Sequence, residues 1–172
     1  NVARTVSSLG AYAYSENDDT FFIDLYAGGT VQTQKGLRLT CRTGFPYDGA
    51  VRYTVGGAGE TTLAIRIPAW SVNTALTVNG QPVDLAAVTR DGYAYLTRAW
   101  QEGDRLELDL DMTPRLVYAS TRVAADSGKA CVRRGALVYC AEEPDNGPIL
   151  PLRIDRTAEP QALPFEPDTL GG

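Results

Sequence analysis

Alternation of apolar and polar residues in short runs is the feature that most constrains how this 172-residue chain can fold. In DRLELDLDM the apolar positions are Leu106, Leu108, Leu110 and Met112, and the polar positions between them are Arg105, Glu107, Asp109 and Asp111. Successive side chains of a β-strand point to opposite faces, so this period predicts a strand with one buried and one wet face. Further runs of this kind are TFFIDLYAGG, LRLTCRT, GAVRYTV, TTLAIRIPAW, ALTVNGQPV and GYAYLTRAW.

The residues between these runs are those that turn a chain. Asn79-Gly80 is a strong signal for a tight hairpin, and KACVRRGALVYC predicts one bent strand or two short strands around Gly135. Short strands separated by Gly, Asn and Pro are typical of β-sandwiches. The predicted fold class is therefore mostly all-β, with antiparallel β-sandwich or jelly-roll-like units.

The two ends of the chain depart from this pattern. Val2, Val6, Leu9 and Ala13 follow helical spacing and predict a short N-terminal helix. After residue 143 the chain holds six of its ten prolines and predicts an extended loop, with an edge strand at 152–154. The predicted organisation is helix in 1–19, a first β-sandwich in 20–112, a second, incomplete one in 113–160, and a mobile tail in 161–172.

The amino-acid composition excludes several classes of function. The chain has no histidine, which excludes a Ser-His-Asp triad, a Cys-His pair and a His-bearing zinc site. Its formal net charge is −5 without a basic stripe, so neither nucleic acid nor membrane is a predicted partner. The cysteines Cys41, Cys131 and Cys140 lie in apolar runs and are interpreted as buried thiols, with a Cys131–Cys140 disulfide as the alternative.

Two sets of side chains are candidates for chemistry. Asp109 and Asp111 share one strand face and could act as a glycosidase carboxylate pair, but Arg105 and Glu107 continue that face and indicate a solvated strand side. Aromatic residues form the other set, which could stack on sugar rings or pack at the sandwich rim: Trp70, Trp100, Tyr93 and Tyr95.

Several stretches, taken in order, resemble one family. They include NVARTVSSLGAYAYS, FFIDLYAGG, FPYDGAVRYTV, LAIRIPAWSVNTALTVNGQPV, GYAYLTRAWQEGDRLELDLDM and RRGALVYCAEEPDN. Residues 1–147 are similar to the later part of bacterial glycoside hydrolase family 127 enzymes, the β-L-arabinofuranosidases and their relatives. The resemblance implies a helical barrel as catalytic domain, followed by β-sandwich domains.

The same resemblance implies where the chemistry lies. The family's nucleophile is a cysteine thiolate bound to zinc, and it precedes the segment that matches Asn1 to Arg4. We therefore expect the chain to begin on the last helix of the upstream catalytic barrel, to be truncated at both ends, and to contain no catalytic residue, cofactor or metal ligand of its own. The three cysteines do not match the family's zinc ligands.

The resulting functional prediction is a non-catalytic accessory region that braces the catalytic barrel of the same chain. The resemblance implies that the parent enzyme removes β-L-arabinofuranosyl or similar sugars from plant-type glycans. The alternative is a carbohydrate-binding module that uses the aromatic residues Trp70, Trp100, Tyr93 and Tyr95. We also expect exposed strand edges, which could support a dimer.

Overall fold

The computed structural model describes residues 2–163, except for the side chain of residue 145, and divides them between two compact units. The first unit is Asn1–Met112 and the second is Thr113–Gly172. No helix among the described residues is long and apolar enough to cross a membrane.

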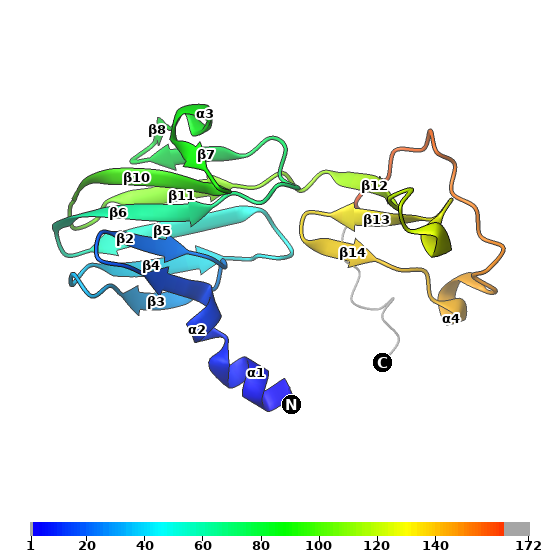
Figure 1. Ribbon diagram of the computed structural model, residues 1–172, viewed down its shortest axis with the longest axis horizontal. Helices are drawn as coiled ribbons and strands as arrows, with labels where there is room; N and C mark the ends of the chain where they lie inside the picture. The colour runs from blue at the N-terminus through cyan, green and yellow to red at the C-terminus, as the bar shows by residue number, and fades with distance from the viewer. Residues whose placement is uncertain (1, 164–172) are drawn as a thin grey trace. The chain divides into compact units, whose positions relative to one another are not determined.

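Two sheets build the first unit (Figure 1). Sheet A has the order β1-β2-β6-β10-β9, with β1 (Tyr14–Glu16), β2 (Thr20–Ile23), β6 (Gly59–Arg66), β10 (Tyr93–Trp100) and β9 (Thr89–Arg90). Sheet B has the order β3-β4-β5-β11-β7-β8, with β3 (Gly29–Gln32), β4 (Arg38–Thr43), β5 (Ala50–Gly56), β11 (Arg105–Asp109), β7 (Ala75–Val78) and β8 (Gln81–Pro82). A short helix, α3 (Leu85–Val88), connects β8 to β9.

The inward side chains of both sheets form one hydrophobic core, so the unit is a β-sandwich. Members from sheet A include Phe21, Ile23, Leu63, Ile65 and Trp100, and members from sheet B include Leu39, Val51, Tyr53, Leu106 and Leu108. The predicted period of two is confirmed in β4, β5 and β11, where buried residues alternate with more exposed ones. The predicted mostly-β sandwich fold is correct.

One strand pair differs from the predicted antiparallel arrangement. β2 and β6 are parallel, with Thr20 opposite Thr62 and Ile23 opposite Ile65. The pairing requires a crossover, because β3, β4 and β5 lie between these strands in the sequence and belong to the other sheet.

The alternation predicted beyond β2 is wrong. The strand ends at Ile23, after which the amides of Asp24 and Leu25 both donate to the Ala13 carbonyl. This bend turns Leu25 outward and buries Tyr26, whereas a period of two through this run would place Leu25 on the buried face with Phe21 and Ile23.

The predicted N-terminal helix is present in two pieces. α1 (Val2–Ser8) and α2 (Gly10–Ala13) are separated at Leu9, and β1 then joins the edge of sheet A. Ala13 is buried, whereas Val2, Val6 and Leu9 are exposed.

The second unit has one three-stranded sheet of β12 (Pro114–Tyr118), β13 (Ala130–Arg134) and β14 (Leu137–Tyr139). It also has a 3-10 helix (Ala124–Asp126) and α4 (Glu143–Asn146). Of the two alternatives around Gly135, two strands are correct, since Gly135 turns the chain with a φ of 58°. The edge strand expected at 152–154 is absent, and residues 164–172 of the predicted tail lie outside the described residues.

Candidate functional site

An aromatic cluster lies on the outer face of sheet A. Tyr93 and Tyr95 project from β10, and Phe22 from β2 meets both rings edge-on, at centroid distances of 5.6 and 6.2 Å. We call Phe22, Tyr93 and Tyr95 the outer aromatic cluster. The predicted common face of the two tyrosines is thus present, with a third ring that the sequence analysis did not include.

The strand register explains how rings from two strands meet. Ala64 of β6 lies between Phe22 and Tyr95 and pairs with both. Although Ala64 is on the outer face, its relative exposure is 0%. A small residue at the central strand lets the two larger rings cover it.

Charged side chains occupy the space around the rings. The guanidinium of Arg90 lies 4.1 Å from the centroid of Tyr95, and that of Arg66 lies 5.5 Å from the centroid of Tyr93. The Tyr93 hydroxyl donates to Asp24 Oδ1 at 2.6 Å, and Arg66 Nη1 donates to that hydroxyl at 3.2 Å. Burial, followed by the hydrogen bond to Asp24, raises the pKa of Tyr93. A ligand that stacks on Tyr95 must therefore displace the Arg90 side chain.

The two tryptophans are not part of this cluster. Trp100 is 1% exposed, and its Nε1 donates to the Thr61 carbonyl at 3.1 Å inside the core. Its even number on β10 puts it on the face opposite to Tyr93 and Tyr95, which strand parity alone could have indicated. Trp70 is partly buried and stacks on Phe45, with 6.4 Å between ring centroids.

The two carboxylates of the possible glycosidase pair have separate partners. Asp109 Oδ1 accepts from Arg52 Nη2 at 2.6 Å on the outer face of sheet B. Asp111 follows the end of β11, and its Oδ2 accepts from Asn73 Nδ2 at 3.3 Å. The Asp109 contact is that of a polar sheet surface, as the flanking Arg105 and Glu107 indicated. Asp111 lies beyond the strand, so the two carboxylates do not share a strand face as the sequence pattern predicts.

The cysteines do not fit a zinc site. Cys41 is buried in the sandwich core, as interpreted from the sequence, whereas in the second unit Cys131 is half-buried and Cys140 is exposed, so the interpretation as buried thiols is wrong for these two. All three are free, so the alternative Cys131–Cys140 disulfide is absent. Burial raises the pKa of the Cys41 thiol, which disfavours the thiolate that zinc binds. Across the described part of the chain, no group of three or more Cys, Asp and Glu side chains is arranged to hold a metal ion.

Comparison with known families assigns both units. A family model for the beta-L-arabinofuranosidase GH127 middle domain matches residues 20–112, and the GH127 C-terminal domain model matches residues 114–167. The chain belongs to glycoside hydrolase family 127. The resemblance noted in the sequence is thereby confirmed.

Relatives of this GH127 chain include bacterial arabinofuranosidases. It is 38% identical to a non-reducing end beta-L-arabinofuranosidase of Bifidobacterium longum subsp. longum, over all of this chain and 28% of that protein. A crystal structure of a GH127 beta-L-arabinofuranosidase from Geobacillus stearothermophilus T6 superposes with a TM-score of 0.82 at 40% identity, covering 87% of this chain and 24% of the other. Another solved GH127 beta-arabinofuranosidase gives a TM-score of 0.78 at 34% identity, covering 84% and 26%.

The coverage limits what these relatives say about the chain. It spans about a quarter of the length of each, so it corresponds to a domain region of larger proteins.

Proposed function

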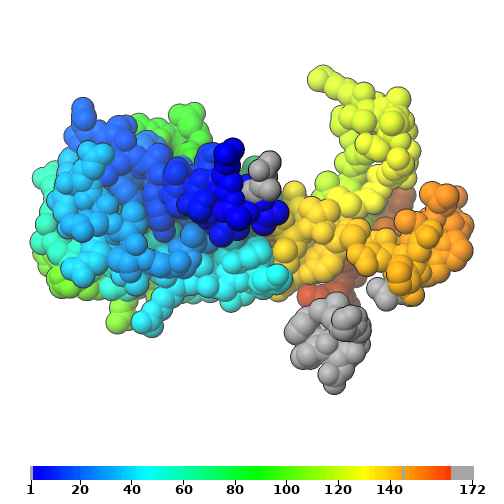
Figure 2. Space-filling view, turned by 90° about the horizontal axis from the view of Figure 1, so that it is seen from below, coloured from blue at the N-terminus to red at the C-terminus, as the bar shows by residue number. Residues whose placement is uncertain are grey.

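We propose that this GH127 chain is a non-catalytic accessory region that braces the catalytic domain of a glycoside hydrolase. The observation that carries the proposal is an exposed apolar stripe that runs along α1, Leu9 and α2. Four apolar side chains at helical spacing are solvent-exposed, namely Val2, Val6, Leu9 and Tyr12, at 79, 67, 47 and 64%. α1 buries none of its own residues, and Figure 1 shows it projecting away from the sheets of the first unit; in Figure 2 it (dark blue) therefore lies in front of them. Such a stripe is stabilised when a further domain covers it.

The outer aromatic cluster supports the same proposal. Tyrosine, phenylalanine and arginine are enriched in protein interfaces, and here Arg66 and Arg90 already cover the rings that a sugar would need. The cluster therefore suits packing against another protein surface better than stacking on a ligand.

The relatives support a proposal for the activity of the whole enzyme. We propose removal of terminal β-L-arabinofuranosyl or similar groups, performed by a zinc-dependent catalytic barrel outside these residues. Residues 1–172 alone are then expected to show no hydrolysis of a chromogenic arabinofuranoside. Turnover by the pure chain would contradict this.

A chimera tests the bracing role. This chain would replace the aligned segment of the Bifidobacterium longum enzyme, and the Tm and activity of the chimera would be measured. Val6→Asp with Leu9→Asp is expected to lower both in the chimera, but to leave the Tm of the isolated chain unchanged because both side chains are exposed there. Ser7→Asp, on the other side of α1 by helical period, is the control. Equal effects of the two substitutions, or a chimera that does not fold, would contradict bracing.

The second candidate function is carbohydrate binding, favoured by the position of Tyr93 and Tyr95 on one face beside Asp24. Calorimetric titration with arabino-oligosaccharide tests it directly. Binding that Tyr95→Ala abolishes and Trp70→Ala preserves would favour this candidate over bracing alone. If the heat released on titration equals the heat of diluting the oligosaccharide into buffer, the chain does not bind it and carbohydrate binding is dismissed.

A further inference from the structure

A polar groove of about 440 Å³ lies on the outer face of sheet B, away from the outer aromatic cluster. Its side chains come from three neighbouring strands, namely Thr40 and Arg42 of β4, Arg52 and Thr54 of β5, and Arg105 and Glu107 of β11. Tyr53 also borders the groove, but its side chain is buried in the core. The volume falls in the range of small-molecule sites.

The strand register brings positive charges together in this groove. Arg42 is directly opposite Arg52, and Thr54 lies between Thr40 and Arg105. Like charges at directly opposite positions destabilise a sheet, so the Arg42–Arg52 pair calls for a compensating negative charge.

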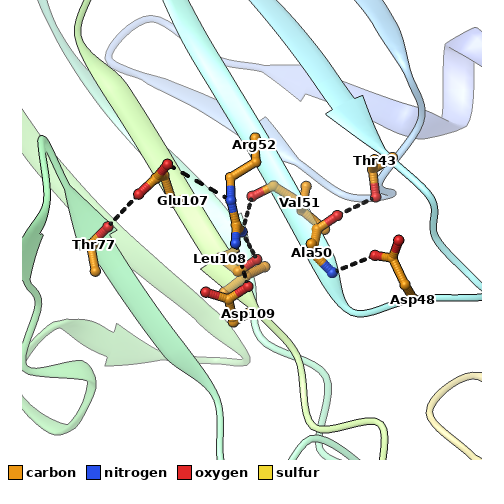
Figure 3. Close-up of polar contacts among 9 residues, drawn as sticks. All are labelled: Thr43, Asp48, Ala50, Val51, Arg52, Thr77, Glu107, Leu108 and Asp109. Carbon is orange, nitrogen blue, oxygen red and sulfur yellow. Dashed lines mark hydrogen bonds and ion pairs between the residues drawn. The ribbon is translucent and has the colours of Figure 1, made fainter.

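The acidic side chains of the face compensate only Arg52. Arg52 Nη2 lies 2.6 Å from Asp109 Oδ1, and Arg52 Nε lies 3.8 Å from Glu107 Oε1. Its Nη1 also donates to the Leu108 carbonyl at 2.8 Å, which holds the guanidinium over β11 (Figure 3). Glu107 accepts a further hydrogen bond from Thr77, at 3.3 Å.

Arg42 and Arg105 are left with uncompensated charge. Both are exposed, and neither forms an ion pair with another side chain that the structure describes. The two guanidinium groups border a groove that Thr40 and Thr54 line with hydroxyls, in a chain of net charge −5. Because the chain as a whole is acidic, it does not attract anions in general. A local excess of positive charge in this groove therefore indicates a ligand that is anionic and bound at this place.

We propose that this groove binds a uronic acid residue of an acidic glycan, with the sugar carboxylate between Arg42 and Arg105 and its hydroxyls at Thr40 and Thr54. Guanidinium groups match carboxylates with paired hydrogen bonds, and threonine hydroxyls can donate to or accept from sugar hydroxyls. An acidic protein fits less well, because protein interfaces have an apolar centre and this groove has no exposed apolar side chain. The choice of a glycan rests on the proposed function, whereas the anionic character of the ligand does not.

Calorimetric titration of the whole chain at low salt, at millimolar ligand concentration, tests the proposal. The probe is an oligogalacturonate, and its methyl ester is the ligand control, since the ester keeps the ring but removes the charge. The acid is expected to bind and the ester to bind at least about tenfold more weakly, the loss expected for a charge-assisted hydrogen-bonded pair.

Two variants locate the site. Arg42→Gln with Arg105→Gln is expected to weaken binding by about tenfold or more. Arg38→Gln is the matched control, because Arg38 is on the same strand and the same face but outside the groove, and it should change binding by less than about twofold. Circular dichroism verifies that the variants are folded.

Three results would overturn the proposal: no binding of the acid, equal binding by the double variant, or tighter binding of an oligoglutamate peptide. The last would identify an acidic protein as the partner. These assays contain no catalytic domain and no hydrolysis step, so their failure is distinguishable from failure of the bracing proposal.

Discussion

At the scale of single residues, Trp100 is the largest fully buried side chain of the first unit. Its ring is buried in the shared core, and its Nε1 hydrogen bond to Thr61 ties β10 to β6. We expect Trp100→Ala to lower the free energy of unfolding by about 3–5 kcal/mol, since it leaves a large cavity and an unpaired carbonyl. Urea denaturation measures this. Trp70→Ala removes an equal side chain from a partly buried position and should cost less, and the opposite order would contradict the assignment of Trp100 to the core.

Asp104 gives the sandwich a predictable dependence on pH. Asn79 Nδ2 donates to it at 2.8 Å, the Gln101 amide donates at 3.0 Å, and Arg98 lies at 3.7 Å. These contacts, the Asn79 hydrogen bond first, lower the pKa of the Asp104 carboxyl. Because the pKa of this carboxyl is lower in the folded state than in the unfolded state, its ionised form stabilises the fold at pH values above the unfolded-state pKa of about 4. This stabilisation is lost as the pH falls through the folded-state pKa.

Asp104→Asn should therefore destabilise the chain by about 1–3 kcal/mol near neutral pH. The difference from the wild type should shrink below about pH 4, where protonation neutralises the wild-type carboxyl too. Denaturation curves over a pH series measure it, with Asp18→Asn at an exposed turn as the control. A difference that does not change with pH would show that the ionised form makes no specific contribution.

At the scale of elements, Gly49 leads into β5 at a point of close backbone approach. A Cβ at this position would collide with the Leu110 carbonyl oxygen and lie 2.9 Å from Met112 Cγ. We expect Gly49→Ala to destabilise the chain by about 1–3 kcal/mol, because the neighbouring atom is backbone and cannot rotate away.

Gly10→Ala is the matched control, because no atom lies within 4 Å of a Cβ there. Gly10 is in α2, where alanine is favoured by about 0.5–1 kcal/mol. Thermal denaturation should give shifts of opposite sign for the two substitutions. Equal shifts would contradict the close packing at Gly49.

The elements also show which parts of the fold the sequence can predict. β4, β5, β6, β10 and β11 are long enough for the period of two to be evident, and Asn79-Gly80 adopts the two positive φ values that its hairpin requires. Asp91-Gly92 adopts the same conformation between β9 and β10, so that hairpin was predictable from the same signal but was not included. Strands of two to four residues, such as β1, β3 and β9, depend on pairing with distant segments and give no periodic signal.

The candidate sites also have a part that local periodicity predicts and a part that it does not. Parity predicts that Tyr93 and Tyr95 share a face, but Phe22 reaches them only through the parallel pairing of β2 with β6. The juxtaposition of Arg42 with Arg52 likewise depends on the β4–β5 register. Contacts across strands that are distant in the sequence cannot be deduced from local periodicity.

At the scale of the whole molecule, the distribution of buried residues predicts unequal stability. All members of the core cluster lie between Phe21 and Leu110, within the first unit. In contrast, no residue of β12, β13 or β14 is fully buried.

A chain shortened to residues 1–112 should therefore unfold cooperatively, with a Tm close to that of the full chain, whereas residues 113–172 alone should not. Scanning calorimetry of both pieces measures this. A cooperative transition in the isolated second piece would contradict the expectation that residues 113–172 lack a sufficient core of their own.

The parallel pairing of β2 with β6 has a consequence for how the chain reaches its native state. β2 can pair with β6 only after the intervening segment, which supplies β3, β4 and β5 to sheet B, has been synthesised. Sheet B likewise pairs β5 with β11, which is distant in the chain, and such contacts are associated with slow folding. A nascent chain that ends before β6 would expose the inner faces of the first strands, so this unit is expected to gain its protection from proteolysis late in synthesis and in a single step.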